Sequence, residues 1–371
     1  MIEWSTVGEI CEVVTPPKKL VKSLYLEVGP YPIIDQGQKI IVGYTDDESS
    51  LVQEGEYVLF GDHTRYIKYF KGRFAQGADG LKILKAKESI LPRYFFYTFE
   101  NTEVPSRGYS RHWSLAKELS IPIPSLSEQQ RIVGILDTFT ASIENLKEQI
   151  AQRRKQYNWL LDKLYFATKA ELLKASQTGK TIVKSFDEIG TFTRGRRFVR
   201  TDIVPEGVPC IHYGDMYTYY GVSAEETPTH LTKDLSAKLR FAKTGDVVIV
   251  GAGENDLDIG VGVAWLGKDP VVVHDACYIF EHNMNPKYLS YYMRSMNYHQ
   301  QIRMGVVDGK ICSISAKELG RTLISVPSID EQQRIVSILD TFEASIQNLE
   351  SQLSQREKQY EFYRNKLLTF D

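Results

Sequence analysis

Two long segments of the chain carry apolar residues at the spacing expected of a helix that buries one edge. In residues 128–164, steps of four and three residues link Ile132, Leu136, Phe139, Ile143, Leu146, Ile150, Tyr157, Leu160 and Leu164. In residues 331–367, the same steps link Ile335, Leu339, Phe342, Ile346, Leu349, Leu353, Tyr360, Tyr363 and Leu367. The pattern skips one position in each segment, at Arg153 and Arg356. An apolar edge kept over about five heptads predicts a coiled-coil helix.

Signals for a helix start precede both segments. Each has a proline (Pro124, Pro327), then a residue suited to the N-cap position (Ser127, Asp330), and a glutamine three residues later (Gln130, Gln333), as in a capping box. We therefore expect two helices of about 40 residues, each about 60 Å long.

The two segments are copies of one another. At a constant offset of 203 residues and without a gap, 24 of 37 positions are identical, so the chain contains an internal duplication. Each apolar edge must be buried, and the nearest partner for one copy is the other copy in the same chain. A dimerisation coiled coil between two chains is the alternative that the pattern leaves open.

The segments that precede the helices are related more loosely. The matching pairs are Tyr31–Gly37 with Val208–Gly214, Glu54–Gly61 with Thr244–Gly251, Leu91–Tyr94 with Asn285–Tyr288, and Ala116–Leu119 with Ala316–Leu319. Short β-branched runs between glycines predict strands in these parts. The chain is therefore expected to contain a globular part, a long helix, a second globular part and a second long helix. We call the two globular parts the first and second head. Similar helices with divergent heads suggest one scaffold that carries two different ligand sites.

Composition places the chain among globular proteins, and its charge is uneven. Of 371 residues, 42% are hydrophobic and 25% charged. The net charge of −2 argues mildly against a simple nucleic-acid binder. However, seven basic and two acidic residues lie between Asp62 and Lys87, and four arginines and no acid lie between Arg194 and Arg200. Local basic stretches of this kind can bind phosphate, and a solvated surface is the alternative.

Other sequence features exclude several classes. No apolar run reaches the roughly 18 residues of a membrane helix, and the first residues do not resemble a signal peptide. The four cysteines are far apart and form no Cys-x-x-Cys pair, which disfavours a metal site or a disulfide framework. We therefore predict no metal, no membrane partner and a cytoplasmic location.

The helix starts carry a family resemblance. Residues 121–132 read IPIPSLSEQQRI and residues 324–335 read ISVPSIDEQQRI. These duplicated sequences, the paired helices and the order of parts resemble the specificity subunits of type I restriction-modification systems. The resemblance covers nearly the whole chain.

The resemblance implies an α+β fold in which two target recognition domains are joined by two long helices. These helices form an antiparallel intramolecular coiled coil with pseudo-two-fold symmetry. The expected parts are recognition domain 1 (1–124), a central helix region (125–175), recognition domain 2 (176–327) and a C-terminal helix region (328–371). Each recognition domain would read one half of a split site in double-stranded DNA, and the helices would set the spacer between the halves.

The resemblance also implies partners. Two methyltransferase subunits would dock on the chain and methylate adenine at N6, and nuclease-translocase subunits can join. S-adenosylmethionine would be bound by the methyltransferase, so no cofactor and no catalysis are expected in this chain. The repeated residues Gln129, Gln130 and Arg131, with their copies Gln332, Gln333 and Arg334, would mark the docking surfaces. Capping together with solvent exposure is the alternative for these six residues.

Candidate DNA contacts are forked or bidentate side chains beside glycines, because such side chains can read base edges. In the first head they are Gln36, Gln38, His63, Arg65, Arg73, Gln76 and Arg111. In the second head they are Arg194, Arg196, Arg197, His212, Tyr213, Asn255 and Lys310. Within the first basic stretch we assign Arg65, Lys68, Lys71 and Arg73 to phosphate rather than to bases. A solvated turn is the alternative reading for each of these residues.

Two further motifs point to other activities but are explained without them. Asn285–Tyr288 approximates the Asn-Pro-Pro-Tyr motif of adenine methyltransferases, yet lacks the second proline, and a helix start accounts for it. Val250–Gly253 contains Gly-x-Gly but not the third glycine of a dinucleotide fingerprint. A stand-alone methyltransferase would need a cofactor domain for which the chain leaves no room. A protein-only adaptor would lack polar, glycine-flanked loops in its heads.

Overall fold

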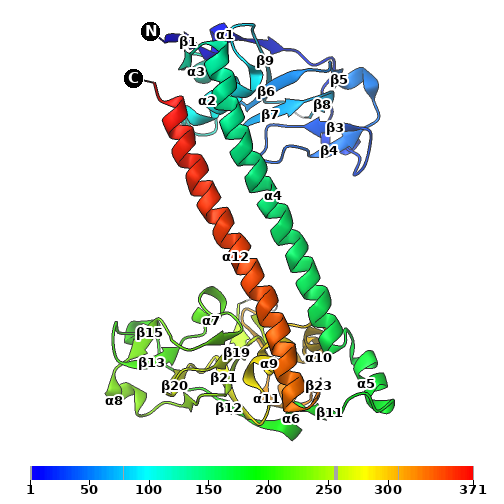
Figure 1. Ribbon diagram of the computed structural model, residues 1–371, viewed down its shortest axis with the longest axis vertical. Helices are drawn as coiled ribbons and strands as arrows, with labels where there is room; N and C mark the ends of the chain where they lie inside the picture. The colour runs from blue at the N-terminus through cyan, green and yellow to red at the C-terminus, as the bar shows by residue number, and fades with distance from the viewer. Residues whose placement is uncertain (1, 78, 255–257, 308, 371) are drawn as a thin grey trace. The chain divides into compact units, whose positions relative to one another are not determined.

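The computed structural model describes residues 2–77, 79–254, 258–307 and 309–370, and Asn255 lies outside them. The chain divides into two compact units (Figure 1). Unit 1 contains Met1–Glu148 and Ser351–Asp371, and unit 2 contains Gln149–Glu350. Both predicted long helices are present, as α4 (Leu126–Tyr165) and α12 (Ile329–Leu368), each of 40 residues. Each long helix contributes one part to each unit.

The long helices begin earlier than the sequence pattern suggests. The backbone N–H of Glu128 donates to Ser125 Oγ at 3.4 Å, and that of Glu331 donates to Ser328 Oγ at 3.3 Å. Ser125 and Ser328 therefore cap the helices. The prediction that Ser127 and Asp330 are the N-caps is wrong, because both lie inside the first helical turn. At the other end of α4, Tyr165 is followed by a separate helix, α5 (Lys169–Gln177).

Within unit 1, the two long helices run antiparallel. Phe139 of α4 stacks on Tyr363 of α12 with ring centroids 5.3 Å apart, and Lys147 pairs with Glu357 at 3.0 Å. Residue numbers rise along one helix as they fall along the other. Arg356, where the apolar pattern skips, lies over the Phe139 ring at 5.7 Å.

Unit 2 repeats this arrangement with its own parts of the helices. Arg154 of α4 pairs with Glu350 of α12, and the Tyr157 hydroxyl donates to Glu343 at 3.4 Å. Arg153, the skipped position of α4, lies over the Phe342 ring at 5.6 Å. The apolar edges thus meet within the chain, and at each skip an arginine covers the other helix's phenylalanine.

The head of unit 1 contains two small sheets. One has the strand order β2-β9-β6-β7 and the other β4-β3-β8-β5, while β1 pairs with β10. The strands are β1 (Glu3–Thr6), β2 (Cys11–Val14), β3 (Tyr31–Ile34), β4 (Gly43–Thr45), β5 (Leu51–Val52), β6 (Glu56–Gly61), β7 (Ile67–Lys71), β8 (Phe74–Gln76), β9 (Leu81–Ala86) and β10 (Ser120–Ile123). The short helices are α1 (Val7–Ile10), α2 (Pro92–Asn101) and α3 (Trp113–Ala116).

The head of unit 2 has the same framework with additions. Its sheets have the orders β12-β21-β17-β19-β14 and β15-β13-β20-β16, and β11 pairs with β23 as β1 does with β10. The strands are β11 (Val183–Ser185), β12 (Gly190–Arg194), β13 (Val208–Ile211), β14 (Ser223–Ala224), β15 (Thr229–Leu231), β16 (Phe241–Ala242), β17 (Val247–Val250), β18 (Ala252–Gly253), β19 (Gly262–Trp265), β20 (Val271–Val273), β21 (Cys277–His282), β22 (Cys312–Ser313) and β23 (Leu323–Ser325). The helices are α6 (Phe186–Ile189), α7 (Asp215–Thr218), α8 (Lys233–Ser236), α9 (Pro286–Tyr292), α10 (Met296–Ile302) and α11 (Ala316–Gly320).

One parallel strand pair is common to both heads. Strand β3 pairs in parallel with β8, and β13 pairs in parallel with β20, whereas their other neighbours are antiparallel. The loosely related segments of the sequence fall on β3 and β13, on β6 and β17, on α2 and α9, and at α3 and α11. The duplication therefore includes the heads.

Each head is fixed to the start of its long helix by a buried glutamine. Gln129 Oε1 accepts the Leu91 N–H at 2.8 Å, and its Nε2 donates to the carbonyls of Ser89 and Pro124. Gln332 likewise accepts the Asn285 N–H at 2.9 Å and donates to a proline carbonyl. These side chains satisfy backbone groups at the starts of α2 and α9.

A second polar contact repeats in both units. The Tyr97 hydroxyl of α2 donates to Asp137 at 2.6 Å, and the Tyr291 hydroxyl of α9 donates to Asp340 at 2.6 Å. A cation completes each cluster, because Arg93 pairs with Asp137 and Lys287 pairs with Asp340. Burial and the adjacent carboxylate together raise the pKa of both tyrosines. The neutral hydroxyls thus remain donors.

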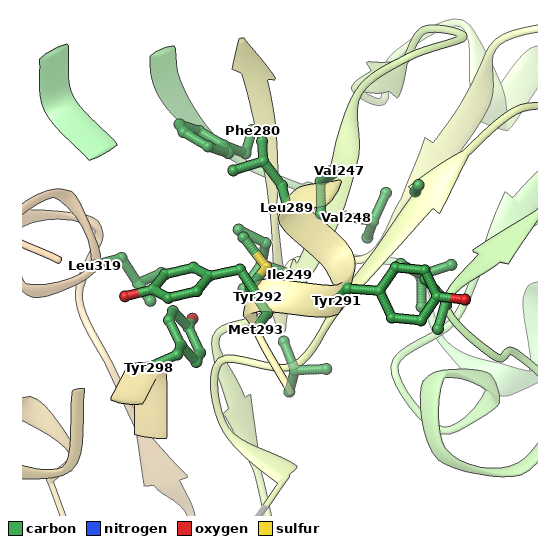
Figure 2. Packing of buried hydrophobic residues seen from close by; sticks show 14 of the residues in the cluster. Val247, Val248, Ile249, Phe280, Leu289, Tyr291, Tyr292, Met293, Tyr298 and Leu319 are labelled. Atoms are coloured by element: carbon green, nitrogen blue, oxygen red, sulfur yellow. The ribbon is translucent and has the colours of Figure 1, made fainter. Parts of the chain in front are cut away.

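The core of unit 2 is rich in tyrosine (Figure 2). Figure 2 shows Tyr292 of α9 beside Tyr298 of α10, while Tyr291 points to the opposite side of α9; all three belong to one core cluster with Val247 to Ile249 of β17. The Tyr292 hydroxyl donates to the Leu323 carbonyl, and the Tyr298 hydroxyl donates to the Gly260 carbonyl at 2.8 Å. Large side chains fill the interior, while the Tyr292 and Tyr298 hydroxyls reach main-chain acceptors and the Tyr291 hydroxyl reaches the Asp340 carboxylate.

Candidate nucleic-acid interface

In each head, loops converge where the parallel strand pair ends. Parallel strands finish at the same edge of a sheet, so the loops after β3 and β8 are neighbours, as are those after β13 and β20. The loop after β6 in unit 1, and the loop after β17 in unit 2, join them. Six of the fourteen predicted DNA contacts lie on these loops, namely Gln36, Gln38, His63, Arg65, His212 and Tyr213.

In unit 1, Gln36 joins the loop after β3 to the loop after β6. Its Oε1 accepts the backbone N–H of His63 at 3.2 Å, and its carbonyl accepts the Thr64 hydroxyl. A side chain at Gly61 or Gly80 would collide with Gln36. Gln36 therefore orders the loops. Its side-chain oxygen accepts from His63, and its amide nitrogen has no hydrogen-bond partner among the residues that the structure describes.

The loop before α3 also joins this cluster. The His112 ring is buried between the Asp62 carbonyl and the backbone N–H of Arg107, each 3.0 Å away. Asp62 also accepts the Trp113 N–H at 2.8 Å. At the loop tip, Tyr109 is 93% exposed and stacks on His63 with ring centroids 5.2 Å apart.

The predicted side chains of the first head differ in accessibility. Gln38, Arg65, Arg73 and Arg111 are exposed, although Arg65 also donates to the Val104 carbonyl at 2.9 Å. Gln76 is buried, and its Nε2 donates to the Leu81 carbonyl at 3.3 Å. Its placement on an accessible loop is therefore wrong.

Two lysines of the first basic stretch interact with oxygen atoms of the protein itself. Lys68 is buried, and its ammonium donates to the main-chain carbonyls of Asp35 and Lys39 at 2.9 and 2.6 Å. Lys71 pairs with Glu56 at 2.8 Å. The expectation that Lys68 holds phosphate is wrong, because its charge is already enclosed by protein oxygens.

Unit 2 has a cavity of about 470 Å³ at the corresponding place. Its lining includes four predicted residues, Arg194, Arg197, His212 and Tyr213, together with Phe198, Arg200, His274 and Glu254. Aromatic rings and guanidinium groups thus share one hollow. Such a hollow can accept both phosphate and base edges.

Histidines in this cavity are held neutral. The Ala276 N–H donates to His274 Nδ1 at 3.1 Å, so the opposite ring nitrogen donates to the Phe198 carbonyl at 3.0 Å. His212 Nδ1 accepts the Gly214 N–H at 3.2 Å. Burial lowers the pKa of both imidazoles and outweighs the nearby aspartates. The positive charge of the cavity therefore comes from arginine.

The arginines around the cavity fall into two groups. Arg194 Nε donates to the Asp275 carbonyl at 2.7 Å, and Arg196 donates to the Lys238 carbonyl at 2.7 Å. Arg197 and Arg200 are exposed, and among the described residues no main-chain carbonyl accepts a hydrogen bond from either side chain. Lys310 is also exposed. Arg197 is thus the predicted contact best placed to meet a ligand.

Sequence reasoning missed two members of the cavity as contacts. Phe198 and Arg200 lie within the arginine-rich stretch from Arg194 to Arg200, but neither stands beside a glycine. An aromatic residue placed among arginines is the signal that would have indicated them. The sequence placed Tyr109 in a predicted loop but did not indicate that its side chain is exposed, because exposure cannot be inferred from the residue type alone.

The six repeated residues of the long helices also separate by accessibility. Gln129 is 0% exposed and Gln332 is 4% exposed, so the expectation that they lie on a docking surface is wrong. Gln130 and Gln333 are exposed. Arg131 and Arg334 are exposed and form bidentate salt bridges with Glu128 and Glu331, respectively.

The described residues also bear on the other motifs. Asn285 caps α9 by accepting the Tyr288 N–H at 3.1 Å, as expected of a helix start. Among the described residues, no group of three or more His, Cys, Asp or Glu side chains is arranged to hold a metal. The four cysteines are buried thiols. Within the described part of the chain, no helix is both long and apolar enough to cross a bilayer.

Comparison with known proteins decides the family. Residues 1–153 and 179–356 match the model of the type I restriction modification DNA specificity domain. The chain belongs to this family. The specificity-family resemblance inferred from the helix starts is thereby confirmed.

Relatives match this specificity-family chain over its whole length. The EcoR124I/EcoR124II specificity subunit of Escherichia coli is 28% identical, with all of this chain and 94% of the relative aligned. A putative type I restriction enzyme specificity subunit of Haemophilus influenzae is 26% identical over all of this chain and 96% of its own. The crystal structure of an S subunit from M. genitalium has a TM-score of 0.62 at 17% identity, covering 100% of this chain and 97% of the other. The α+β fold with two long helices is thus confirmed.

Proposed function

We propose that this specificity subunit reads a bipartite site in double-stranded DNA, with one half-site bound by each head. The observation that carries this proposal is the repetition of one strand framework with different loop chemistry. In both heads the loops converge beside the parallel strand pair, but unit 1 presents Gln38, Arg65 and Arg111 whereas unit 2 presents Arg197 and His212. Equal frameworks with unequal loops fit two different base sequences.

The contacts divide by chemistry. The Arg111 and Arg197 guanidinium groups are assigned to guanine edges, and the free amide nitrogen of Gln36 to an acceptor on a base. Exposed Arg65, Arg73, Arg200 and Lys310 are assigned to phosphate. His63, His212 and Tyr213 support the loops and contact the sugar-phosphate backbone. Arg194, which lines the cavity and donates to the Asp275 carbonyl, shapes its rim, whereas Arg196 donates to the Lys238 carbonyl and is not part of the lining.

The chain is proposed to act without catalysis of its own. Two methyltransferase subunits would bind S-adenosylmethionine and methylate adenine at N6, and nuclease-translocase subunits would add cleavage. The proposed functional parts are recognition domain 1 (1–124), the central helix region (125–175), recognition domain 2 (176–327) and the C-terminal helix region (328–371). Exposed Gln130, Arg131, Gln333 and Arg334 remain candidates for the edge of the methyltransferase contact.

Sequencing of methylated bases tests the proposal directly. A host that lacks other adenine methyltransferases would express this chain with its cognate methyltransferase subunit. We expect N6-methyladenine in a two-part motif with a constant spacer, and none when either chain is expressed alone. Methylation by this chain alone would instead favour a stand-alone enzyme. Stable assembly with the methyltransferase but no gel shift on duplex DNA would favour a protein-only adaptor.

A further inference from the structure

One aromatic side chain projects from the tip of the loop that precedes α3 in the first head. Tyr109 is 93% exposed, and its ring stacks on His63 of the loop after β6, with an interplanar angle of 18°. Single exposed apolar side chains are common on protein surfaces, so exposure alone would mean little. Here, however, a second ring supports one face of the tyrosine and leaves the remainder open. A ring held in this way can stack on a further flat partner without much loss of freedom.

Hydrogen bonds hold both loops that meet at this stack. In the Tyr109 loop, the Arg107 N–H donates to His112 Nε2 at 3.0 Å, and the Ser110 hydroxyl donates to the Arg107 carbonyl at 3.2 Å. The His63 N–H donates to the Gln36 side chain. The buried Nδ1 of His63 has no hydrogen-bond partner among the described residues, so this side chain acts through the face of its ring. The two rings are therefore arranged in advance of any ligand.

Arginines surround the exposed ring. Arg107 and Arg111 lie two residues to either side of Tyr109, and Arg65 lies two residues after His63. All three arginines are exposed, and Arg107 and Arg111 form no salt bridge with any residue that the structure describes. Cations beside an aromatic platform match a nucleic acid, which offers phosphates and flat bases within a few ångströms of each other. The charge around Tyr109 thus favours DNA over an apolar protein pocket as its partner.

The second head has no aromatic residue at the corresponding place. Tyr109 stands seven residues before the repeated segment Ala116–Leu119, and Gly309 stands seven residues before its copy, Ala316–Leu319. This feature therefore belongs to the divergent loops, which distinguish the heads, and not to the shared framework.

We propose that Tyr109 enters the base stack of the half-site read by the first head and separates two neighbouring base pairs, with His63 supporting it from behind. This inference rests on the proposed function, because it requires that the first head bind duplex DNA. Side chains that insert between base pairs unstack and kink the duplex. Pyrimidine–purine steps unstack most readily, so the half-site should favour such a step at the point of insertion. Tyr109 would thus select sequence without a hydrogen bond to any base.

Base stacking in the bound duplex tests this inference. The chain would be purified with its cognate methyltransferase subunit and mixed with duplexes that contain the methylated motif. Each duplex would carry 2-aminopurine, whose fluorescence rises when the base is unstacked, at a different position. The methylated adenines are left unlabelled, because methyltransferases flip their target base out of the helix. We expect a severalfold rise in fluorescence at one step of the half-site read by the first head.

Variants of the exposed ring separate insertion from general damage. Tyr109→Ala should abolish the rise and weaken DNA binding by about fivefold or more, because one base–aromatic stack is lost. Tyr109→Trp keeps a flat ring and should keep both effects. Tyr219→Ala, which removes a 57% exposed tyrosine of the second head, is the matched control and should leave the signal of the first half-site unchanged. Thermal unfolding should be the same for all these variants, since both tyrosines are exposed.

A mismatch in the DNA provides a second, independent readout. A mismatched pair at the responsive step lowers the cost of unstacking. The mismatch should therefore improve binding by the unaltered chain relative to binding by the Tyr109→Ala variant. Equal effects of the mismatch on the two proteins would contradict insertion.

The outcomes distinguish this inference from the proposed function. If the unaltered complex binds no duplex DNA, the proposed function fails. If it binds the motif but no labelled step brightens, or if the rise persists in Tyr109→Ala, Tyr109 does not enter the stack. Weaker DNA binding by Tyr109→Ala without any change in fluorescence would place the ring on the sugar-phosphate backbone and overturn the inference. Loss of the methyltransferase subunit from the Tyr109→Ala complex would assign the ring to a protein contact, and would also overturn it.

Discussion

Gln129 illustrates how one buried side chain can attach a head to a helix. Its amide group makes three hydrogen bonds, one accepted from Leu91 and two donated to Ser89 and Pro124. Removing it leaves these backbone groups unpaired, and an unpaired buried polar group costs roughly 1–3 kcal/mol. The glutamine that follows it in the sequence, Gln130, is exposed. The two adjacent glutamines thus differ in role: Gln129 attaches the head to the helix, and Gln130 is exposed.

Gln129→Ala should lower the free energy of unfolding of unit 1 on the order of 2 kcal/mol. Gln130→Ala is the matched control and should change it by no more than about 0.5 kcal/mol, as is usual for a surface substitution. Urea denaturation monitored by tryptophan fluorescence would measure both. Equal effects of the two substitutions would contradict the role of Gln129 in attaching the head to α4.

His282 makes the stability of unit 2 depend on pH. Burial lowers the pKa of His282 to about 4, against an ordinary value of 6.5. Its Nδ1 accepts the Met284 N–H at 3.2 Å, while its buried Nε2 has no hydrogen-bond partner in the described structure. The His282 imidazole therefore stays neutral in the folded state under conditions, below pH 6.5, in which it is protonated in the unfolded chain.

Unit 2 should therefore lose stability as the pH falls from about 6.5 towards 4, by roughly 1–2 kcal/mol from His282 at pH 5. His282→Asn keeps a side-chain acceptor within reach of the Met284 N–H but cannot be protonated in this range. Urea denaturation at pH 7.5 and at pH 5.0 should show a smaller loss for the variant than for the unaltered chain. A loss of the same size in both proteins would rule out His282 as the cause.

At the scale of elements, the loops of each head are expected to act on one half-site only. Arg111→Ala should relax or weaken recognition of one half-site, and Arg197→Ala that of the other. Each loss should amount to roughly 1–3 kcal/mol of discrimination, or about tenfold to a hundredfold. Sequencing of methylated bases would show which half of the motif broadens, and each variant serves as the control for the other. Both variants broadening the same half would contradict the assignment of one half-site to each head.

The long helices were predictable because their period is local. Steps of three and four residues define the buried edge without any knowledge of distant residues, and α4 and α12 follow it closely. Their starts were misplaced by two residues, because Ser125 and Ser127 are both acceptable N-caps and only the observed hydrogen bond to Glu128 distinguishes them. The apolar periodicity predicts that a helix is present more reliably than it predicts the residue at which the helix begins or ends.

The heads were predictable only in outline, because their strands are short and pair with distant segments. Lys68 seemed a surface cation in a basic stretch, but two carbonyls from the segment after β3 enclose its ammonium. Gln76 seemed part of a polar loop, but the Leu81 carbonyl binds it inside the head. Both outcomes depend on chain segments that meet only in the folded protein, so composition near each residue could not reveal them.

On the scale of the whole molecule, the duplicated helices predict how the recognised site should respond to a change in helix length. Residues 144–150 and 347–353 are equivalent seven-residue stretches, and deleting both shortens each helix by one heptad while preserving the apolar edge. At 1.5 Å per residue this removes about 10 Å, or roughly three base pairs of duplex. We expect the methylated motif to keep both half-sites and to lose about three base pairs of spacer. A deletion of three residues from each helix would break the heptad pattern and should abolish methylation rather than shift the spacer. Unchanged spacing after the heptad deletion would mean that something other than the helices, such as the methyltransferase subunits, sets the distance between half-sites.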